Sequence, residues 1–105
     1  MHFSSNVVHR PPQARLTVAG ELDLSSAGSI RRDVEDALSA GTTDFVVDTS
    51  EVTFVDAAGL RAFVRLRNAA LARNGTFTVV AASAPFVWVC GMAGLQRAFG
   101  LDRAS

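Results

Sequence analysis

The sequence is short of residues on which several classes of protein depend. It has a single cysteine, Cys90, which excludes an internal disulfide and a cysteine-based metal cluster. It has no lysine, and its ten basic residues are matched by ten acidic ones, so we expect no direct binding of nucleic acid. No apolar run approaches the ~18 residues that a membrane-spanning helix needs, so we expect no membrane insertion.

The length and composition are those of one small domain. A chain of 105 residues can bury one core, and an apolar content of 49% lies above the range typical of disordered chains. Residues 1–6 have neither a charged start nor an apolar stretch, so we expect no signal peptide and a cytoplasmic location. No linker, repeat or low-complexity segment divides the sequence. We therefore expect residues 1–105 to form a single domain.

The chain opens with two expected strands. The first covers residues 3–9 and stops at Pro11 and Pro12, because proline donates no hydrogen bond to a sheet and has a fixed φ. The second covers residues 16–19 and ends at Gly20. Because the connection between them is short, we expect an antiparallel pair.

Two helices follow. The first begins at Ser25 or Ser26, either of which can cap it, and ends at Gly41. Its apolar residues recur at helical spacing: Ala27, Ile30, Val34, Ala37 and Leu38. The second begins at Asp56, which is placed to cap it, and ends within residues 73–75. We expect its core side to carry Leu60, Phe63, Val64 and Leu71, and another side to carry Arg61, Arg65 and Asn68.

The remaining elements complete an alternating pattern. Residues 45–47 form a continuous apolar run, which is typical of a parallel strand covered by helices. Residues 76–81 form the next strand, and the helix between the two implies a parallel, right-handed crossover. Residues 86–90 have no polar face, so periodicity does not separate a helix from a buried strand there. The order β-β-α-β-α-β-α predicts an α/β domain with a small, mixed, mostly parallel sheet and helices packed on it.

Four segments in this order resemble the STAS domains of bacterial anti-sigma factor antagonists. Residues 20–23 (Gly-Glu-Leu-Asp) resemble the opening of that family, and residues 46–56 resemble its central strand and the loop leading to its regulatory site. Residues 56–60 (Asp-Ala-Ala-Gly-Leu) stand where the family carries Asp-Ser-Ser/Thr-Gly-Leu. Residues 83–95 are similar to its Ser-Pro…Gly-Leu segment. The resemblance covers about residues 18–101 and implies a single STAS-like domain.

The resemblance implies a noncatalytic module that binds an anti-sigma factor and so influences sigma-factor-dependent transcription. In the family, that partner is also a kinase that phosphorylates the serine after the aspartate, and the unphosphorylated form binds the partner. The matching residue here is Ala57, followed by Ala58, so neither position offers a hydroxyl and the usual phosphoswitch cannot operate. A displaced phosphorylation site would have to use a nearby hydroxyl such as Thr49, Ser50 or Thr53.

The resemblance places the partner-binding surface at Asp23, Asp56, Ala57, Ala58, Gly59, Arg61 and Arg65. Each has a simpler interpretation as well: Asp56 can be an ordinary helix cap, and the two alanines are good helix formers. Gly59 would allow a partner's backbone to approach closely. Arg61 and Arg65 lie one helical turn apart, where they are either solvated or in contact with acidic groups of the partner.

Other chemistry has little support in the sequence. No Gly-x-Ser-x-Gly motif is present, and His2 and His9 lack the spacing of metal ligands, so we expect no enzyme and no metal. No glycine-rich phosphate loop precedes a Lys-Ser/Thr pair, so we expect no cofactor. The alternative function is a STAS subunit of a lipid-transport ABC system that docks on its ATPase subunit.

The apolar run at residues 86–90 has more large side chains than one helix face can bury. If it is a helix, Phe86, Val89 and Cys90 can face the core, which leaves Val87 and Trp88 outside. An exposed Trp beside a Val suggests a homodimer or another partner contact. The other interpretation is that the C-terminal tail folds over and covers both residues.

Overall fold

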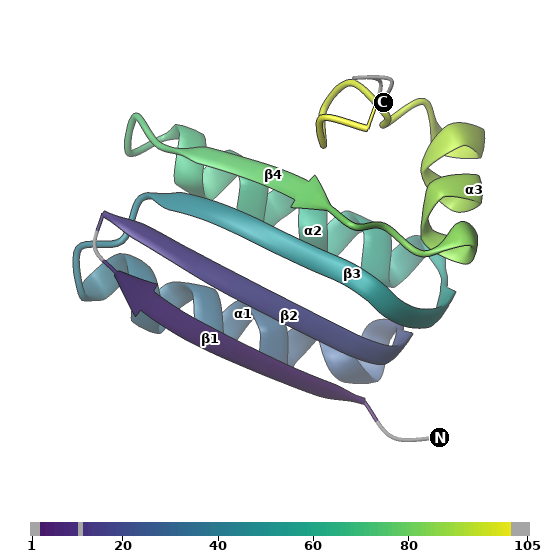
Figure 1. The fold of residues 1–105 in the computed structure, drawn as a ribbon, viewed down its shortest axis with the longest axis horizontal. Helices are drawn as coiled ribbons and strands as arrows, with labels where there is room; N and C mark the ends of the chain where they lie inside the picture. Colours follow the sequence, from purple (N-terminus) through teal and green to yellow (C-terminus); the bar gives the residue numbers. More distant parts are fainter. Residues whose placement is uncertain (1–2, 11, 102–105) are drawn as a thin grey trace.

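A computed structural model of the chain describes residues 3–10 and 12–101. In order, its elements are β1 (Ser4–Arg10), β2 (Gln13–Leu22), α1 (Leu24–Ser39), β3 (Asp44–Val55), α2 (Ala57–Leu71), β4 (Thr76–Val80) and α3 (Ala84–Ala93). The strands form one sheet in the order β1-β2-β3-β4, with β1 antiparallel to β2 and the other neighbours parallel (Figure 1). This confirms the expected element order and the mixed, mostly parallel sheet.

Helices α1 and α2 lie side by side over one face of the sheet, and no helix of the described residues covers the other face (Figure 1). Burial alternates along the strands accordingly. Phe45 and Val47 of β3 are buried beneath the helices, whereas Val46 lies half-buried on the open face. The expectation that this apolar run is covered on both sides was therefore wrong. A single half-exposed valine is tolerated because much of any protein surface is apolar.

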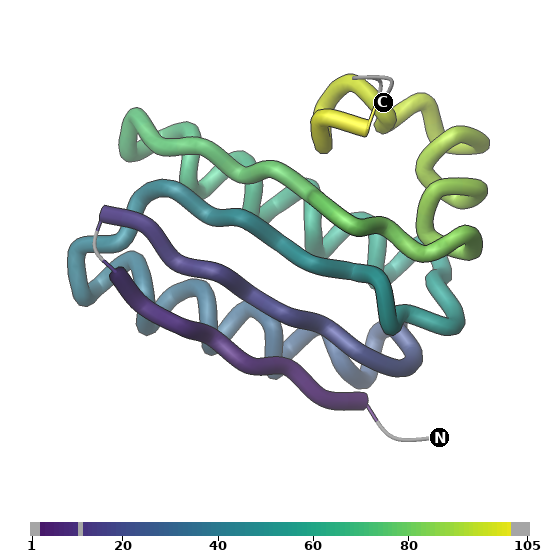
Figure 2. The backbone as a smooth tube through the Cα atoms, viewed as in Figure 1, coloured from purple at the N-terminus to yellow at the C-terminus, as the bar shows by residue number. Residues whose placement is uncertain are grey.

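A cluster of phenylalanines joins the last third of the chain to the sheet and α2. The ring centroid of Phe63, in α2, lies 5.8 Å from that of Phe77 in β4 and 5.6 Å from that of Phe86 in α3. Phe99, from the segment after α3, lies 6.1 Å from Phe63. The same segment accepts a hydrogen bond from Val79 N through Phe99 O at 3.0 Å, so the chain returns beside β4 (Figure 2).

Residues 86–90 belong to a helix. Ser83 caps it by accepting a hydrogen bond from Phe86 N at 3.3 Å. Phe86 and Cys90 are buried and Trp88 is 66% exposed, as expected for a helix. The described part of the C-terminal tail, up to Leu101, packs near β4 and leaves Trp88 uncovered, so the interpretation in which this tail hides Trp88 was wrong for these residues.

Two further details concern burial. Leu71, expected on the core side of α2, is 43% exposed, and Leu66 and Ala70 are buried instead. Leu71 is the last residue of the helix, one position and thus about 100° of rotation beyond Ala70.

Burial raises the pKa of the Cys90 thiol to about 11, so the thiol stays protonated and unreactive at neutral pH.

The contrast between Phe86 and Trp88 gives a first prediction. Phe86→Ala removes a ring from the phenylalanine cluster and should lower the free energy of unfolding by about 3–5 kcal/mol. Trp88→Ala removes an exposed side chain and should cost less than about 1 kcal/mol. Urea unfolding followed by far-UV circular dichroism measures both variants. A comparable loss in the two would show that Trp88 is part of the core.

Candidate functional site

Two aspartates cap neighbouring helices at the carboxyl ends of β2 and β3. Leu22 and Val55 are partners in the parallel ladder, and Asp23 and Asp56 follow them directly. The backbone N–H of Asp56 donates to the carbonyl oxygen of Leu22 at 3.2 Å. Because adjacent strands lie about 4.8 Å apart, α1 and α2 begin side by side at one end of the sheet (Figure 1).

Asp23 is the cap of α1. Its Oδ1 accepts hydrogen bonds from Ser25 Oγ at 2.6 Å and Ser26 N at 3.1 Å, and Ser26 Oγ accepts from Asp23 N at 2.9 Å. These bonds, that of Ser25 foremost, hold the pKa of the Asp23 carboxyl below its usual range. The expectation that Ser25 or Ser26 caps the helix was wrong. A carboxylate is the stronger acceptor, and Ser26 completes a capping box instead.

Asp56 caps α2, as expected. Its Oδ1 accepts a hydrogen bond from the backbone N–H of Gly59 at 2.9 Å. Ala57 and Ala58 are then the first two residues of the helix; Ala57 is exposed and Ala58 half-buried. The position that the resemblance assigns to the phosphorylated serine is therefore accessible at the surface but carries only a methyl group.

Gly59 has a different role from the one expected. A Cβ built at this buried glycine would lie 2.7 Å from the carbonyl carbon of Leu22 and 2.9 Å from its Cγ. Real Cβ atoms do not approach other atoms so closely, so α2 can cross the end of β2 only with glycine here. The space that was expected to admit a partner's backbone is occupied by the chain's own backbone.

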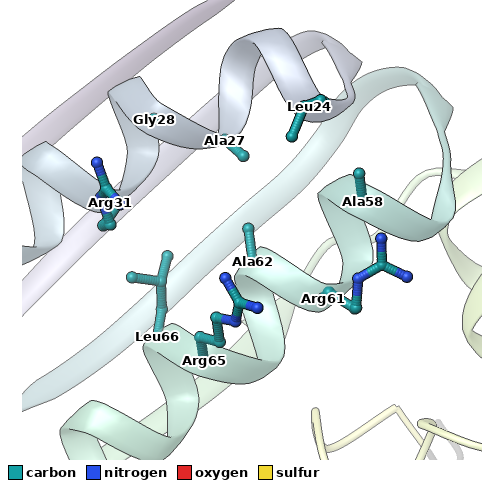
Figure 3. Close-up of a pocket in the computed structure, with 9 residues that line it drawn as sticks. All are labelled: Leu24, Ala27, Gly28, Arg31, Ala58, Arg61, Ala62, Arg65 and Leu66. Carbon is teal, nitrogen blue, oxygen red and sulfur yellow. The ribbon is translucent and has the colours of Figure 1, made fainter.

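Arg61 and Arg65 line a pocket of about 400 Å³ between α1 and α2 (Figure 3). Arg31 of α1 lines the same pocket. Small residues from both helices contribute most of the remaining lining: Ala27, Gly28, Ala58 and Ala62. Arg31 and Gly28 were not predicted from the sequence to belong to the site. Their i, i+3 spacing on one helix face was visible, but only the packing of α1 beside α2 shows that this face lines a pocket.

The three candidate positions for a displaced phosphorylation site differ in accessibility. Thr49 is fully buried in β3, so a kinase cannot reach its hydroxyl in this structure. Ser50 and Thr53 are exposed. Ser50 Oγ donates to Asp48 Oδ1 at 2.7 Å, and the backbone N–H of Ser50 donates to the same atom at 2.9 Å. These two bonds, with a smaller contribution from Arg15, lower the pKa of Asp48.

The described part of the chain contains neither a cluster of metal ligands nor a membrane-spanning helix. His9 is exposed in β1, with its Nδ1 3.5 Å from Thr42 Oγ1, while His2 lies outside the described residues. No group of three or more His, Cys, Asp or Glu side chains is placed to hold a metal ion among residues 3–10 and 12–101. None of the helices in these ranges is both long and apolar enough to cross a membrane.

Comparison with known proteins relates the chain to STAS domains. A family model described as "Mlab, STAS domain" matches residues 5–103. An anti-sigma factor antagonist from Mycobacterium paratuberculosis superposes with a TM-score of 0.81 at 21% identity, covering 98% of this chain and 87% of that one. The unphosphorylated anti-sigma factor antagonist SpoIIAA, a Bacillus protein, gives 0.77 at 22%, covering 91% and 84%.

The fold is also found in a protein linked to transport. A sulfate transporter family protein from Wolinella succinogenes superposes with a TM-score of 0.75 at 17% identity, covering 91% of this chain and 78% of that one. No curated protein sequence matches the chain significantly. At these identities the solved structures show a shared fold.

Two glycine substitutions test how the site is built. Gly59→Ala should lower the free energy of unfolding by about 1–3 kcal/mol, because its Cβ collides with the backbone of Leu22. Gly28→Ala is the matched control in α1, because a Cβ at this position meets no atom within 4 Å. Since alanine is a better helix former than glycine, this variant should raise the free energy of unfolding by about 0.5–1 kcal/mol. Urea titration of both variants measures the difference. Equal stabilities would contradict the close crossing of α2 over β2.

Proposed function

Since the chain belongs to the STAS domain family, we propose that it is a noncatalytic regulatory module that binds an anti-sigma factor in the cytoplasm and so influences sigma-factor-dependent transcription. The observation that supports this most strongly is the exposed start of α2 beside Asp23, where the resemblance places the regulatory site. The proposed partner-binding surface comprises Asp23, Asp56, Ala57, Ala58, Arg61 and Arg65. Gly59 supports this surface from within.

The charges of the surface define what a partner must offer. Asp23 and Asp56 each use Oδ1 for capping, and in the described part of the chain Oδ2 of each accepts no hydrogen bond. A cationic or N–H group of a partner can therefore bind Oδ2 without breaking the caps. Arg61 and Arg65, on the following turns of α2, need acidic groups opposite them. The matching partner surface combines both signs of charge.

Ala57 determines how binding is regulated. A phosphoryl group at this position would add about two negative charges next to Asp56. With a methyl group there, the surface keeps its unmodified charge, which in the family is the binding form. We therefore propose a constitutive binder, whose activity depends on its amount or on a second signal rather than on phosphorylation at the start of α2.

A second candidate is a STAS subunit of a lipid-transport ABC system that docks on the ATPase subunit. The observation that favours it is the description of the matching family model, which names Mlab rather than an anti-sigma factor antagonist. Both candidates use a protein-binding surface without catalysis. They are distinguished by the protein that binds: an anti-sigma factor or an ATPase subunit, each taken from the genes that adjoin this one.

Isothermal titration calorimetry with the purified anti-sigma factor tests the proposed function. We expect the wild type to bind and to remain free of phosphate after incubation with the kinase and ATP, because Ala57 has no hydroxyl. Ala57→Ser should cost only about 0.5 kcal/mol of stability and should gain one phosphoryl group by intact mass, with loss of binding. Ala58→Ser is the matched control, with its hydroxyl one residue further on.

Two outcomes would contradict this scheme. Phosphate on Ser50 or Thr53 of the wild type, located by peptide mapping and accompanied by loss of binding, would replace the constitutive binder with a displaced switch. Binding of the ATPase subunit, with no binding of the anti-sigma factor, would favour the second candidate.

We also propose self-association through α3. Val87, Trp88 and Met92 are exposed, and α3 carries no charged residue, so two copies meet without like-charge repulsion there. Sedimentation equilibrium from micromolar to millimolar concentration should show a dimer that Trp88→Ala weakens about tenfold or more. Leu71→Ala, which truncates an exposed apolar residue of α2, should leave it unchanged. A wild type that stays monomeric throughout would overturn the proposal.

A further inference from the structure

Three arginines give the pocket between α1 and α2 a positive charge. Arg31 lies on the α1 side, and Arg61 and Arg65 lie on the α2 side (Figure 3). Within residues 3–10 and 12–101, none of the three takes part in a hydrogen bond or an ion pair. Three unpaired guanidinium groups around one pocket make a local positive field in a chain whose formal net charge is zero.

The lining between these arginines is small and apolar. Ala27 and Gly28 contribute from α1, and Ala58 and Ala62 from α2. Gly28 leaves open space, since a Cβ there would meet no atom within 4 Å. Leu24, at the start of α1, lines the same pocket and is 76% exposed. The pocket therefore offers a groove with apolar walls and a rim of arginines.

We propose that this groove binds an acidic amphipathic helix of the partner protein. Apolar side chains of that helix enter between α1 and α2, and its carboxylates pair with Arg31, Arg61 and Arg65. The inference rests on the proposed function, because the groove shares Ala58, Arg61 and Arg65 with the proposed partner-binding surface. It adds Arg31 and Gly28 to that surface and specifies the chemistry of the bound segment.

The spacing of the arginines favours a helix over a small anion. Arg61 and Arg65 are four residues apart, which on a helix is about 6 Å along the axis, and Arg31 belongs to the opposite helix. Charges distributed over two helices favour a ligand that presents several anionic groups over one that presents a single group. Carboxylates placed four residues apart on an incoming helix repeat at the same 6 Å interval, roughly one per turn.

The test uses a synthetic amphipathic peptide about 15 residues long, with leucine along one face and glutamate on both flanks. It is titrated into the ¹⁵N-labelled full chain at low salt, and amide shifts are recorded by NMR. We expect the shifts to concentrate in residues 24–31 of α1 and 58–66 of α2. The affinity should fall as salt rises, since exposed ion pairs are screened. A peptide with lysine in place of glutamate should not bind.

Matched variants separate the groove from general charge. Arg31→Glu should weaken peptide binding about tenfold or more, whereas Arg32→Glu, the adjacent exposed arginine outside the pocket, should change it little. Gly28→Phe should block the groove, whereas Gly28→Ala should leave it open. Far-UV circular dichroism checks that each variant is folded, and Arg31→Glu, at an exposed position, tests the groove without filling it.

Three outcomes would overturn the proposal that the groove binds an acidic helix: amide shifts outside these two helices, equal binding of the lysine peptide, or displacement of the peptide from the same amides by inorganic phosphate. An anti-sigma factor that binds the wild type and Arg31→Glu with equal affinity would show that the groove is not its binding site, while leaving the proposed function intact. If the acidic peptide binds in the groove and no anti-sigma factor binds the chain, the proposed function fails and the groove remains a site for an acidic helix of another protein.

Discussion

The close crossing of α2 over the end of β2, at Gly59 and Leu22, is the constraint on which the proposed partner-binding surface depends. Glycine at this position lets the first turn of α2 lie directly against the strand, and the hydrogen bond from Asp56 N to Leu22 O fixes the same crossing one turn earlier. The start of α2 is thereby held next to Asp23 at the start of α1. Any bulkier residue at position 59 would push the start of α2 away from the end of β2.

Within this arrangement, residues that stabilise the fold also belong to the proposed partner-binding surface. Asp23 and Asp56 each stabilise a helix with one carboxylate oxygen, and the other oxygen accepts no hydrogen bond among the described residues. Small residues such as Ala58 permit the helices to lie close, yet leave a groove because their side chains do not fill it. Stability and recognition therefore draw on the same side chains, and a substitution at either aspartate affects both. Arg31, Arg61 and Arg65 make no hydrogen bond or ion pair within residues 3–10 and 12–101, so their proposed role in recognition does not compete with a role in folding.

The one-sided packing of the sheet separates the surfaces of the molecule. Helices α1 and α2 cover one face, the phenylalanine cluster around Phe63 fixes α3 and the following segment beside β4, and the opposite face stays open. The proposed partner-binding surface at the start of α2 and the apolar surface of α3 are thus carried by different helices. Under the proposed function, Ala57 stands where the family carries the phosphorylated hydroxyl, so the proposed control of binding lies elsewhere in the chain or in the partner.

The sequence by itself determined what depends on neighbours along the chain: the element order, the Asp56 cap, and the missing hydroxyl at Ala57. These follow from hydrogen bonds and side-chain patterns within a few residues, which no distant contact overrides. Only the tertiary structure decided which residues meet across elements. It brought Gly59 against the end of β2, where the glycine serves packing rather than access, and it placed Arg31 of α1 on the same pocket as the two arginines of α2. The reason is physical: side-by-side placement of two helices is decided by their packing on the sheet, and residues far apart in the sequence give no local signal of it.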